Sequence, residues 1–174
     1  MRSPRLLLVL VVAALTLPAQ PAARAAPGSA VATALWAWPA AGAGPSAGPQ
    51  VTRPFQPPPT PYAAGHRGVD LAGVPGQPVL AAGAGTVAFA GMVAGRPVVS
   101  VDHADGLRTT YEPVQPAVAA GQQVSRGSPL GVLLAGHDGC PAAACLHWGL
   151  RRGETYLDPL SLLRPPRVRL LPWH

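Results

Sequence analysis

Three side chains in this 174-residue chain have the types and spacing of a metal site. His66 and Asp70 lie four residues apart, and His147 follows far downstream in the segment Cys145-Leu146-His147-Trp148. Two imidazoles and one carboxylate match a catalytic zinc site, in which three protein ligands leave the fourth position for water. We therefore expect His66, Asp70 and His147 to bind one Zn²⁺, with the alternative that Asp70 orients a ligand without binding the ion itself.

The four-residue spacing restricts the local structure. On a straight strand, two residues four apart are separated by about 13 Å, too far to share an ion bound at about 2.0–2.2 Å. Gly65 and Gly68, together with Val69 and Leu71, disfavour a helix here. The pattern predicts a bent loop that enters a strand, with the glycines allowing the bend. We expect His147 to reach the ion from a separate strand.

Further segments extend the pattern into a family resemblance. The His-x-x-x-Asp motif and the late Leu-His-aromatic segment are similar to those of the lysostaphin/LytM family of zinc metallopeptidases, which cut peptidoglycan cross-bridges. The resemblance spans residues 36 to 164 and includes the segments 76–82, 85–87, 101–103, 106–111 and 157–159. It implies a LytM-like all-β fold, zinc as the metal, and action on peptidoglycan stem peptides or cross-bridges.

Two positions depart from the family pattern. Members normally carry one further histidine two residues before the last ligand, where this chain has Cys145. They carry another at the end of a Tyr-x-His segment, where this chain has Pro113. Both histidines handle protons, and general acid–base catalysis contributes about 10²–10⁴-fold in rate. The departures therefore predict weak activity, or a domain that has lost catalysis.

Three residues are candidates to compensate for the missing histidines. His137 lies in the Gly-rich loop before Cys145, and we retain it as the candidate catalytic residue. Glu112 carries a carboxylate, but strand alternation predicts that it points to the face opposite Pro113. His103 ends a strand-like segment, and we expect it to make a structural hydrogen bond.

Cys140 and Cys145 are the only cysteines of the chain. In an exported protein the default prediction for such a pair is a disulfide, here closing the loop before His147. A second possibility remains open, because Cys145 and His147 alternate onto one strand face. A Cys145 thiolate could then complete a closed tetrahedral zinc site, which would be structural.

The remaining pattern predicts an all-β domain. Short segments bounded by Gly, Pro and Asp predict an antiparallel β-sandwich or partly open barrel. No segment has sustained helical periodicity, and one helical turn is expected after Asp158, with Pro159 at its first position. We expect Trp148 in the core. The predicted strands lie near residues 69–72, 79–81, 85–90, 97–103, 107–112, 129–134 and 145–151.

The domain organisation follows from the composition of the ends. Residues 1–25 have a basic start, a 12-residue apolar run from Leu6 to Leu17, and a small-residue cleavage site at Ala23-Arg24-Ala25. That run is shorter than the roughly 20 residues of a membrane span. We predict a signal peptide (1–25), an Ala/Gly/Pro-rich linker with an aromatic-Pro lead-in strand (26–50), a LytM-like metallopeptidase domain (51–164) and a basic tail (165–174). The protein is then secreted or held in the cell envelope.

The net charge of the chain says little about its function. All 13 basic residues are arginines, and loss of Arg2, Arg5 and Arg24 with the signal peptide lowers the formal charge from +6 to +3. No basic stripe interleaved with aromatics is present, so we expect no nucleic-acid partner. Our first hypothesis is a monomeric, secreted zinc metalloendopeptidase of the bacterial cell wall. The alternative is a degenerate module that keeps the metal site and binds the wall or regulates other wall hydrolases.

Overall fold

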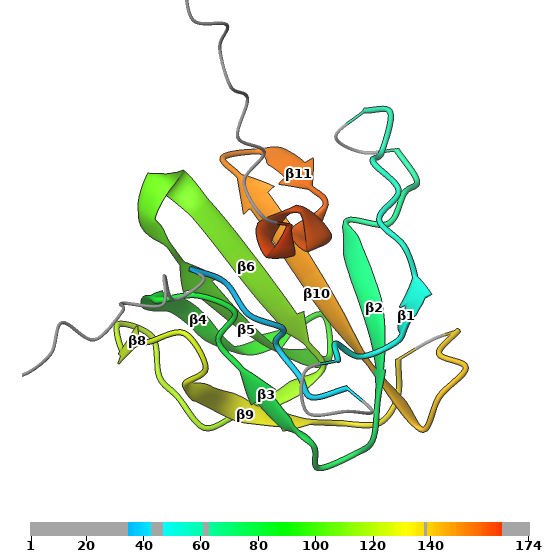
Figure 1. Ribbon diagram of the computed structural model, residues 1–174, viewed down its shortest axis with the longest axis horizontal. Coiled ribbons are helices and arrows are strands. Elements are labelled where there is room, and N and C mark those ends of the chain that lie inside the picture. The colour runs from blue at the N-terminus through cyan, green and yellow to red at the C-terminus, as the bar shows by residue number, and fades with distance from the viewer. Residues whose placement is uncertain (1–34, 43–46, 61–62, 138, 165–174) are drawn as a thin grey trace, which may run out of the picture. The chain divides into compact units, whose positions relative to one another are not determined.

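The computed structural model describes residues 35–42, 47–60, 63–137 and 139–164 (Figure 1). The predicted signal peptide, part of the linker and the basic tail lie outside these residues. The described residues form eleven β-strands and two short 3₁₀ helices, which confirms the all-β prediction. They contain no helix with the length and apolar character that crossing a membrane requires.

All seven predicted strands are present, each within three residues of its predicted ends. The other four strands, β1, β7, β8 and β11, are short and are not among these seven. The strands are β1 (Val51–Arg53), β2 (Gly68–Gly73), β3 (Pro78–Leu80), β4 (Gly85–Val93), β5 (Arg96–Asp102), β6 (Leu107–Glu112), β7 (Val114–Pro116), β8 (Gln123–Val124), β9 (Pro129–Leu133), β10 (Ala144–Arg152) and β11 (Thr155–Leu157).

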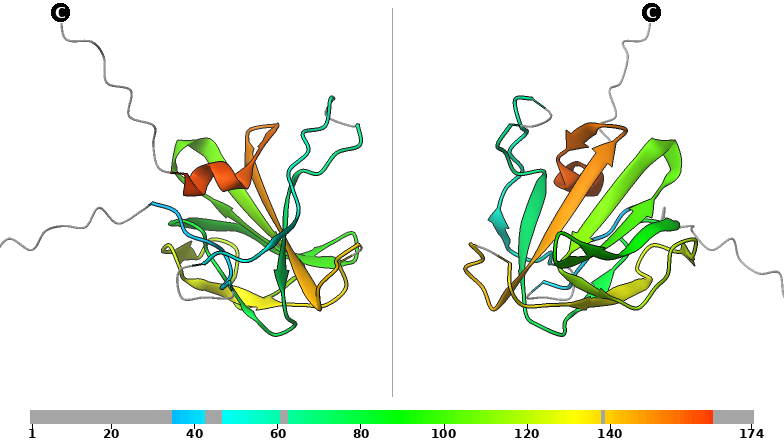
Figure 2. Two further views of the ribbon diagram at one scale, coloured as in Figure 1. Left: turned by 45° about the vertical axis from the view of Figure 1, so that its right-hand side comes forward. Right: turned by 180° about the vertical axis from the view of Figure 1, so that it is seen from behind.

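The strands form two antiparallel sheets. The larger has eight strands in the order β1-β2-β10-β6-β5-β4-β8, with β11 pairing to the end of β10. The smaller has the order β3-β9-β7, and β3 and β9 lie below the large sheet in the views of Figures 1 and 2. Because β1 and β8 lie at opposite ends of the order, the large sheet does not close into a barrel. This agrees with the predicted sandwich or partly open barrel.

Strand β10 is an interior strand of the large sheet and lies between β2 and β6. Alternation along β10 divides its side chains between two faces. Leu146, Trp148 and Leu150 point to one face and are buried, which confirms the predicted core position of Trp148. His147 is on the opposite face, two residues after Cys145. The same strand therefore builds both the core and the candidate site.

The aromatic-Pro lead-in packs against this core, although it lies outside the named strands. The Trp36 ring meets the His103 ring edge-on with centroids 4.8 Å apart, and the Trp38 ring lies 6.4 Å from that of Trp148. Backbone hydrogen bonds from Ala37 N to Ala82 O and from Leu80 N to Pro39 O hold the segment in place. Trp36 and Trp38 are therefore partly buried against the core.

The predicted helical turn is also present, as the 3₁₀ helix η2 (Pro159–Leu163). Asp158 caps it by accepting a 3.0 Å hydrogen bond from Leu160 N on its carboxylate, and Pro159 occupies the first position. The second 3₁₀ helix, η1 (Ala104–Gly106), only connects β5 to β6.

Candidate metal centre

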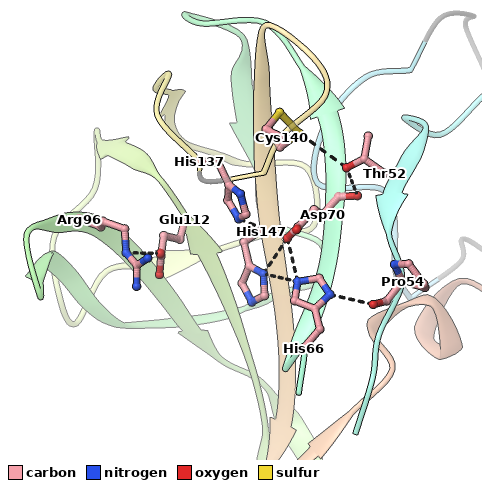
Figure 3. A network of polar contacts seen from close by, with 10 residues as sticks. Thr52, Pro54, His66, Asp70, Arg96, Glu112, His137, Cys140 and His147 are labelled. Atoms are coloured by element: carbon pink, nitrogen blue, oxygen red, sulfur yellow. Dashed lines mark hydrogen bonds and ion pairs between the residues drawn. A yellow bond between two sulfur atoms is a disulfide. The ribbon is translucent and has the colours of Figure 1, made fainter. Parts of the chain in front are cut away.

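The three predicted ligands converge on one point (Figure 3). Asp70 Oδ1 lies 2.9 Å from His66 Nε2 and 2.9 Å from His147 Nδ1, and the two ring nitrogens are 3.1 Å apart. The three candidate ligand atoms all fall within 4.8 Å of one another. Residues separated by 81 positions in the sequence, His66 and His147, thus share one small volume.

Two neighbouring elements position these side chains. Asp70 in β2 is the direct cross-strand partner of His147 in β10, so both side chains point to the same face. His66 precedes β2 and forms an isolated bridge with Gln56, with backbone hydrogen bonds in both directions. The chain therefore bends between His66 and the strand, as the four-residue spacing predicts. This bend brings the His66 ring back to Asp70.

Gly65 and Gly68 are needed here because neighbouring atoms lie too close for a side chain, rather than because the backbone bends at them. Neither Gly65 nor Gly68 has a positive φ. A Cβ on Gly68 would lie 2.4 Å from Trp148 O and 2.7 Å from His147 Nε2, and one on Gly65 would lie 2.8 Å from Gln56 O. The absence of a side chain at Gly68 leaves the space that the His147 ring occupies.

Neighbouring groups orient the ligands. His66 Nδ1 donates to the carbonyl oxygen of Pro54 at 2.7 Å, which leaves Nε2 with its lone pair toward Asp70. Thr52 Oγ1 donates to the backbone oxygen of Asp70 at 3.1 Å. Fixing the second ring nitrogen on a carbonyl is the usual way in which proteins set the orientation of a metal-binding histidine.

The donor set fits a zinc ion. A lone pair on His66 Nε2 faces a carboxylate oxygen, so two acceptors meet without a proton between them. A cation placed among the three atoms would satisfy both. Two imidazoles and one carboxylate are a regular zinc set, and His66 and Asp70 are buried while His147 is only half-buried. The centre is therefore open on one side.

The charge of Asp70 also suits a ligand. Burial alone would raise the pKa of this carboxyl. The hydrogen bond with His147 acts in the opposite direction, as does the positive charge of His137 and His66 when these rings are protonated, and together they hold the pKa of Asp70 below its ordinary value. The side chain is thus a carboxylate at neutral pH.

The candidate catalytic residue, His137, lies beside this cluster. Its Nε2 is 3.4 Å from Asp70 Oδ1, and its ring stacks on that of His147 with centroids 6.2 Å apart. His137 comes from the loop between β9 and β10, which is tied to β10 by a Cys140–Cys145 disulfide. Cys140 N also donates to His137 O at 3.2 Å. The predicted disulfide is present. Cys145 therefore has no free thiol, which rules out the alternative in which it binds zinc.

The expectation for Glu112 was wrong. Glu112 is the cross-strand partner of His147, so its side chain is on the face of the candidate centre. β6 ends at Glu112, and alternation does not continue to Pro113, so both residues line the same cleft. The cleft has a volume of about 340 Å³, and its other lining side chains include His66, His137, His147, Arg53, Arg67 and Arg96. The three arginines were missed because their positions carry no motif.

His103 has the structural role that the sequence predicts. Its ring bonds to Ala84 O at 2.8 Å and to Thr109 Oγ1 at 2.7 Å, and the Thr109 hydroxyl lies 2.9 Å from that of Tyr111. Burial lowers the pKa of His103 and raises that of Tyr111 to about 12. Both groups are therefore neutral at pH 7, with Tyr111 inside the core and His103 half-buried.

The fold and the site together define a class: an all-β domain with a His/Asp/His centre of metal-binding type at the base of a cleft. The chain belongs to Peptidase family M23, whose sequence model matches residues 64–159. This finding confirms the lysostaphin/LytM resemblance.

The chain is also similar to an uncharacterized protein and to solved structures. The uncharacterized protein Rv2891 of Mycobacterium tuberculosis is 56% identical over 128 residues, which are 71% of this chain and 51% of that protein. The chain thus spans about half the length of the curated relatives it matches. A zinc-containing peptidase from Vibrio cholerae is 26% identical, with a TM-score of 0.55 over 68% of this chain and 37% of that one. A chain of the SpoIIIAH–SpoIIQ complex is 25% identical, with a TM-score of 0.58 over 72% of this chain and 98% of that one.

Proposed function

We propose that the domain is a zinc metallopeptidase that hydrolyses peptide bonds in peptidoglycan stem peptides or cross-bridges. The observation that carries the proposal is the convergence of His66 Nε2, Asp70 Oδ1 and His147 Nδ1 within 4.8 Å at the base of an open cleft. Membership of Peptidase family M23 and the likeness to a zinc-containing peptidase support it. The proposed ligands are His66, Asp70 and His147, and the proposed metal is Zn²⁺.

A zinc ion bound there supplies a Lewis acid for the scissile carbonyl and lowers the pKa of a bound water. The chain's own residues do the rest. Pro54 O fixes the His66 ring, and Asp70 contributes one negative charge to the centre. The half-buried His147 and the cleft beside it leave access for a peptide.

His137 is the proposed proton-handling residue. An imidazole can accept a proton and return it at neutral pH, which neither the Pro113 ring nor a disulfide sulfur can do. Its Nε2 lies 3.4 Å from the Asp70 carboxylate, within reach of a group bound at the centre. The disulfide that consumes Cys145 also ties down the loop that carries His137. One imidazole would then replace the two that the family pattern places nearby.

The same proposal includes location and partners. A signal peptide over residues 1–25 would export the protein to the cell envelope, where its peptidoglycan substrate lies. We propose that it acts as a monomer and binds no nucleic acid. N-terminal sequencing of protein recovered from the exported fraction tests the cleavage after Ala25. A start at Met1 there would contradict it.

A second function is favoured by specific observations. Pro113 and Cys145 stand where the family pattern has histidines, and one similar chain is solved in the SpoIIIAH–SpoIIQ complex. The domain would then retain its metal centre but bind the wall, or act on other wall hydrolases, without hydrolysis. This candidate differs from the first in requiring no turnover.

Muropeptide release and zinc content, measured on the same samples, separate the two functions. We expect slow, zinc-dependent release by the wild type and none by His66→Ala. His137→Ala should lose on the order of 10²-fold in rate while keeping its zinc. Arg126→Ala, in an exposed turn away from the cleft, is the control and should match the wild type. Undiminished release by His66→Ala would defeat the peptidase proposal. No release by zinc-loaded wild type that still sediments with cell walls would support the binding module.

A further inference from the structure

The short strand β1 and the residue that follows it contact two of the three proposed ligands, although they supply none themselves. β1 stands at one end of the strand order of the large sheet and pairs with β2. Thr52 Oγ1 lies 3.1 Å from Asp70 O, and Pro54 O lies 2.7 Å from His66 Nδ1 (Figure 3). An edge segment of three residues, 52–54, therefore touches both Asp70 and His66.

A β-bulge in β1 brings Thr52 to Asp70. Val51 pairs with Leu71 and Arg53 pairs with Asp70, so β1 advances by two residues while β2 advances by one. Thr52 is the extra residue of this bulge. Bulges are frequent at sheet edges and next to active sites, where they turn a side chain in a new direction. Here Arg53 is exposed, whereas Thr52 is half-buried with its hydroxyl at the Asp70 backbone.

The hydroxyl group of Thr52 donates its hydrogen to Asp70. A carbonyl oxygen can only accept, so Thr52 Oγ1 is the donor in the contact with Asp70 O. The other neighbour of the hydroxyl, Cys145 Sγ at 3.6 Å, belongs to the disulfide and carries no hydrogen. A sulfur of this kind is at best a weak acceptor, so this second contact is mainly packing. The Thr52 side chain is thus held between Asp70 and the disulfide.

We propose that Thr52 is a positioning residue of the metal centre, which holds the Asp70 backbone where its carboxylate can bind Zn²⁺. Asp70 has a short side chain, so a displacement of its backbone moves Oδ1 away from the two imidazole nitrogens that lie 2.9 Å from it. Partners that orient metal ligands typically change metal affinity by about 10-fold to 100-fold. The inference rests on the zinc-binding part of the proposed function and does not require hydrolysis.

Three substitutions in the full chain, with the disulfide intact, test the proposal. Thr52→Val removes the hydroxyl and keeps the β-branched shape, Thr52→Ala removes both, and Thr52→Ser keeps the hydroxyl. Competition with a chelator measures the zinc dissociation constant, and the visible absorption of Co²⁺ bound in place of zinc reports the coordination geometry. We expect Thr52→Val and Thr52→Ala to bind zinc about tenfold more weakly and to change the Co²⁺ spectrum. Thr52→Ser should retain most of the wild-type affinity and the wild-type spectrum.

Thr86→Val is the matched control. Thr86 is also a strand threonine with one side-chain hydrogen bond, accepted from Gln123 Nε2 at 2.9 Å, but it lies in β4 and outside the cleft lining. This variant should bind zinc as the wild type does. Thermal unfolding of the metal-free proteins shows how much each substitution costs in stability alone.

The outcomes separate this inference from the proposed function. Lower stability of Thr52→Val with unchanged zinc affinity and Co²⁺ spectrum would make the residue merely structural and overturn the inference. Normal affinity in Thr52→Ala, or an equal loss in Thr52→Ser, overturns it too, because the hydroxyl would not be the cause. Weaker zinc binding by the valine and alanine variants, without wall hydrolysis by the wild type, supports the inference and counts only against the peptidase. A wild type that binds neither metal overturns both.

Discussion

At the scale of single residues, the candidate metal centre depends on a glycine, Gly68, at a position where a side chain would not fit. Gly68 provides no ligand, yet its bare backbone leaves room for the His147 ring. The nearest atoms to an added Cβ include the backbone oxygen of Trp148 at 2.4 Å, which cannot move without shifting strand β10. The residue that allows the site to form therefore takes no part in its chemistry.

Gly68→Ala should lower both the stability and the zinc content of the protein. Overpacking of this kind costs about 1–3 kcal/mol. Gly149→Ala is the matched control, because a Cβ there meets Arg67 O and Thr110 Cβ at an ordinary 3.5 Å. Thermal unfolding and metal analysis of both variants check the expectation. Equal zinc content in the two would show that the space at Gly68 is not what positions His147.

His103 makes the stability of the fold depend on pH. Burial lowers the pKa of its imidazole from the ordinary 6.5, so the unfolded chain takes up this proton at a higher pH than the folded one. The contribution of neutral His103 to the free energy of unfolding is present above pH 6.5. It is lost as the pH falls from 6.5 through the lower, folded-state pKa.

His103→Gln should remove this component. We expect the variant to be less stable than the wild type at neutral pH and the difference to shrink on acidification. Urea unfolding of both proteins between about pH 8 and pH 5 measures it. Other titrating groups, Asp70 included, are common to both proteins and cancel in the comparison. A stability difference that stays constant with pH would contradict the proposed role of burial.

At the scale of elements, the loop between β9 and β10 brings His137 to the centre, and the disulfide anchors it. Cys140→Ser/Cys145→Ser should lose about 2 kcal/mol of stability, since the bridge closes only a short loop. Zinc content should be unchanged, because the three proposed ligands, His66, Asp70 and His147, lie outside that loop. Muropeptide release should fall about 10-fold to 100-fold as His137 loses its position. Release at the wild-type rate by the zinc-loaded double variant would rule out a catalytic role for the anchored loop.

The same elements show how far the sequence was informative. Strand positions were predictable because alternation and Gly/Pro boundaries are local signals. The convergence of the three proposed ligands and the disulfide were predictable because few residue types can form such groups. The sheet face to which the Glu112 side chain points was not predictable, because it depends on the cross-strand register with His147 and on where β6 ends. Arg53, Arg67 and Arg96 of the cleft were not predicted for the same reason, because only the sheet order brings β1, β5 and the segment before β2 around one cleft.

At the scale of the whole molecule, metal binding and folding should be linked. The three proposed ligands come from β2, β10 and the loop before β2, so they meet only in the folded chain. Zinc at about 100 times its dissociation constant should therefore add about 2.7 kcal/mol to the free energy of unfolding. Thermal unfolding in a zinc titration, and again after chelation, measures this effect. His147→Ala should show no zinc-dependent shift, and a shift equal to that of the wild type would place the metal elsewhere.

Because β10 pairs with a strand on each side, an error in its register would have two effects at once. A slip of one residue between β10 and its neighbours would exchange its two faces. Trp148 would then be driven into the polar cleft and His147 into the apolar interior, where its imidazole would have no partner. A mispaired copy would lose its core and its metal together. Zinc binding would therefore report the native register of β10, because a chain in which this strand is shifted by one residue has no metal site.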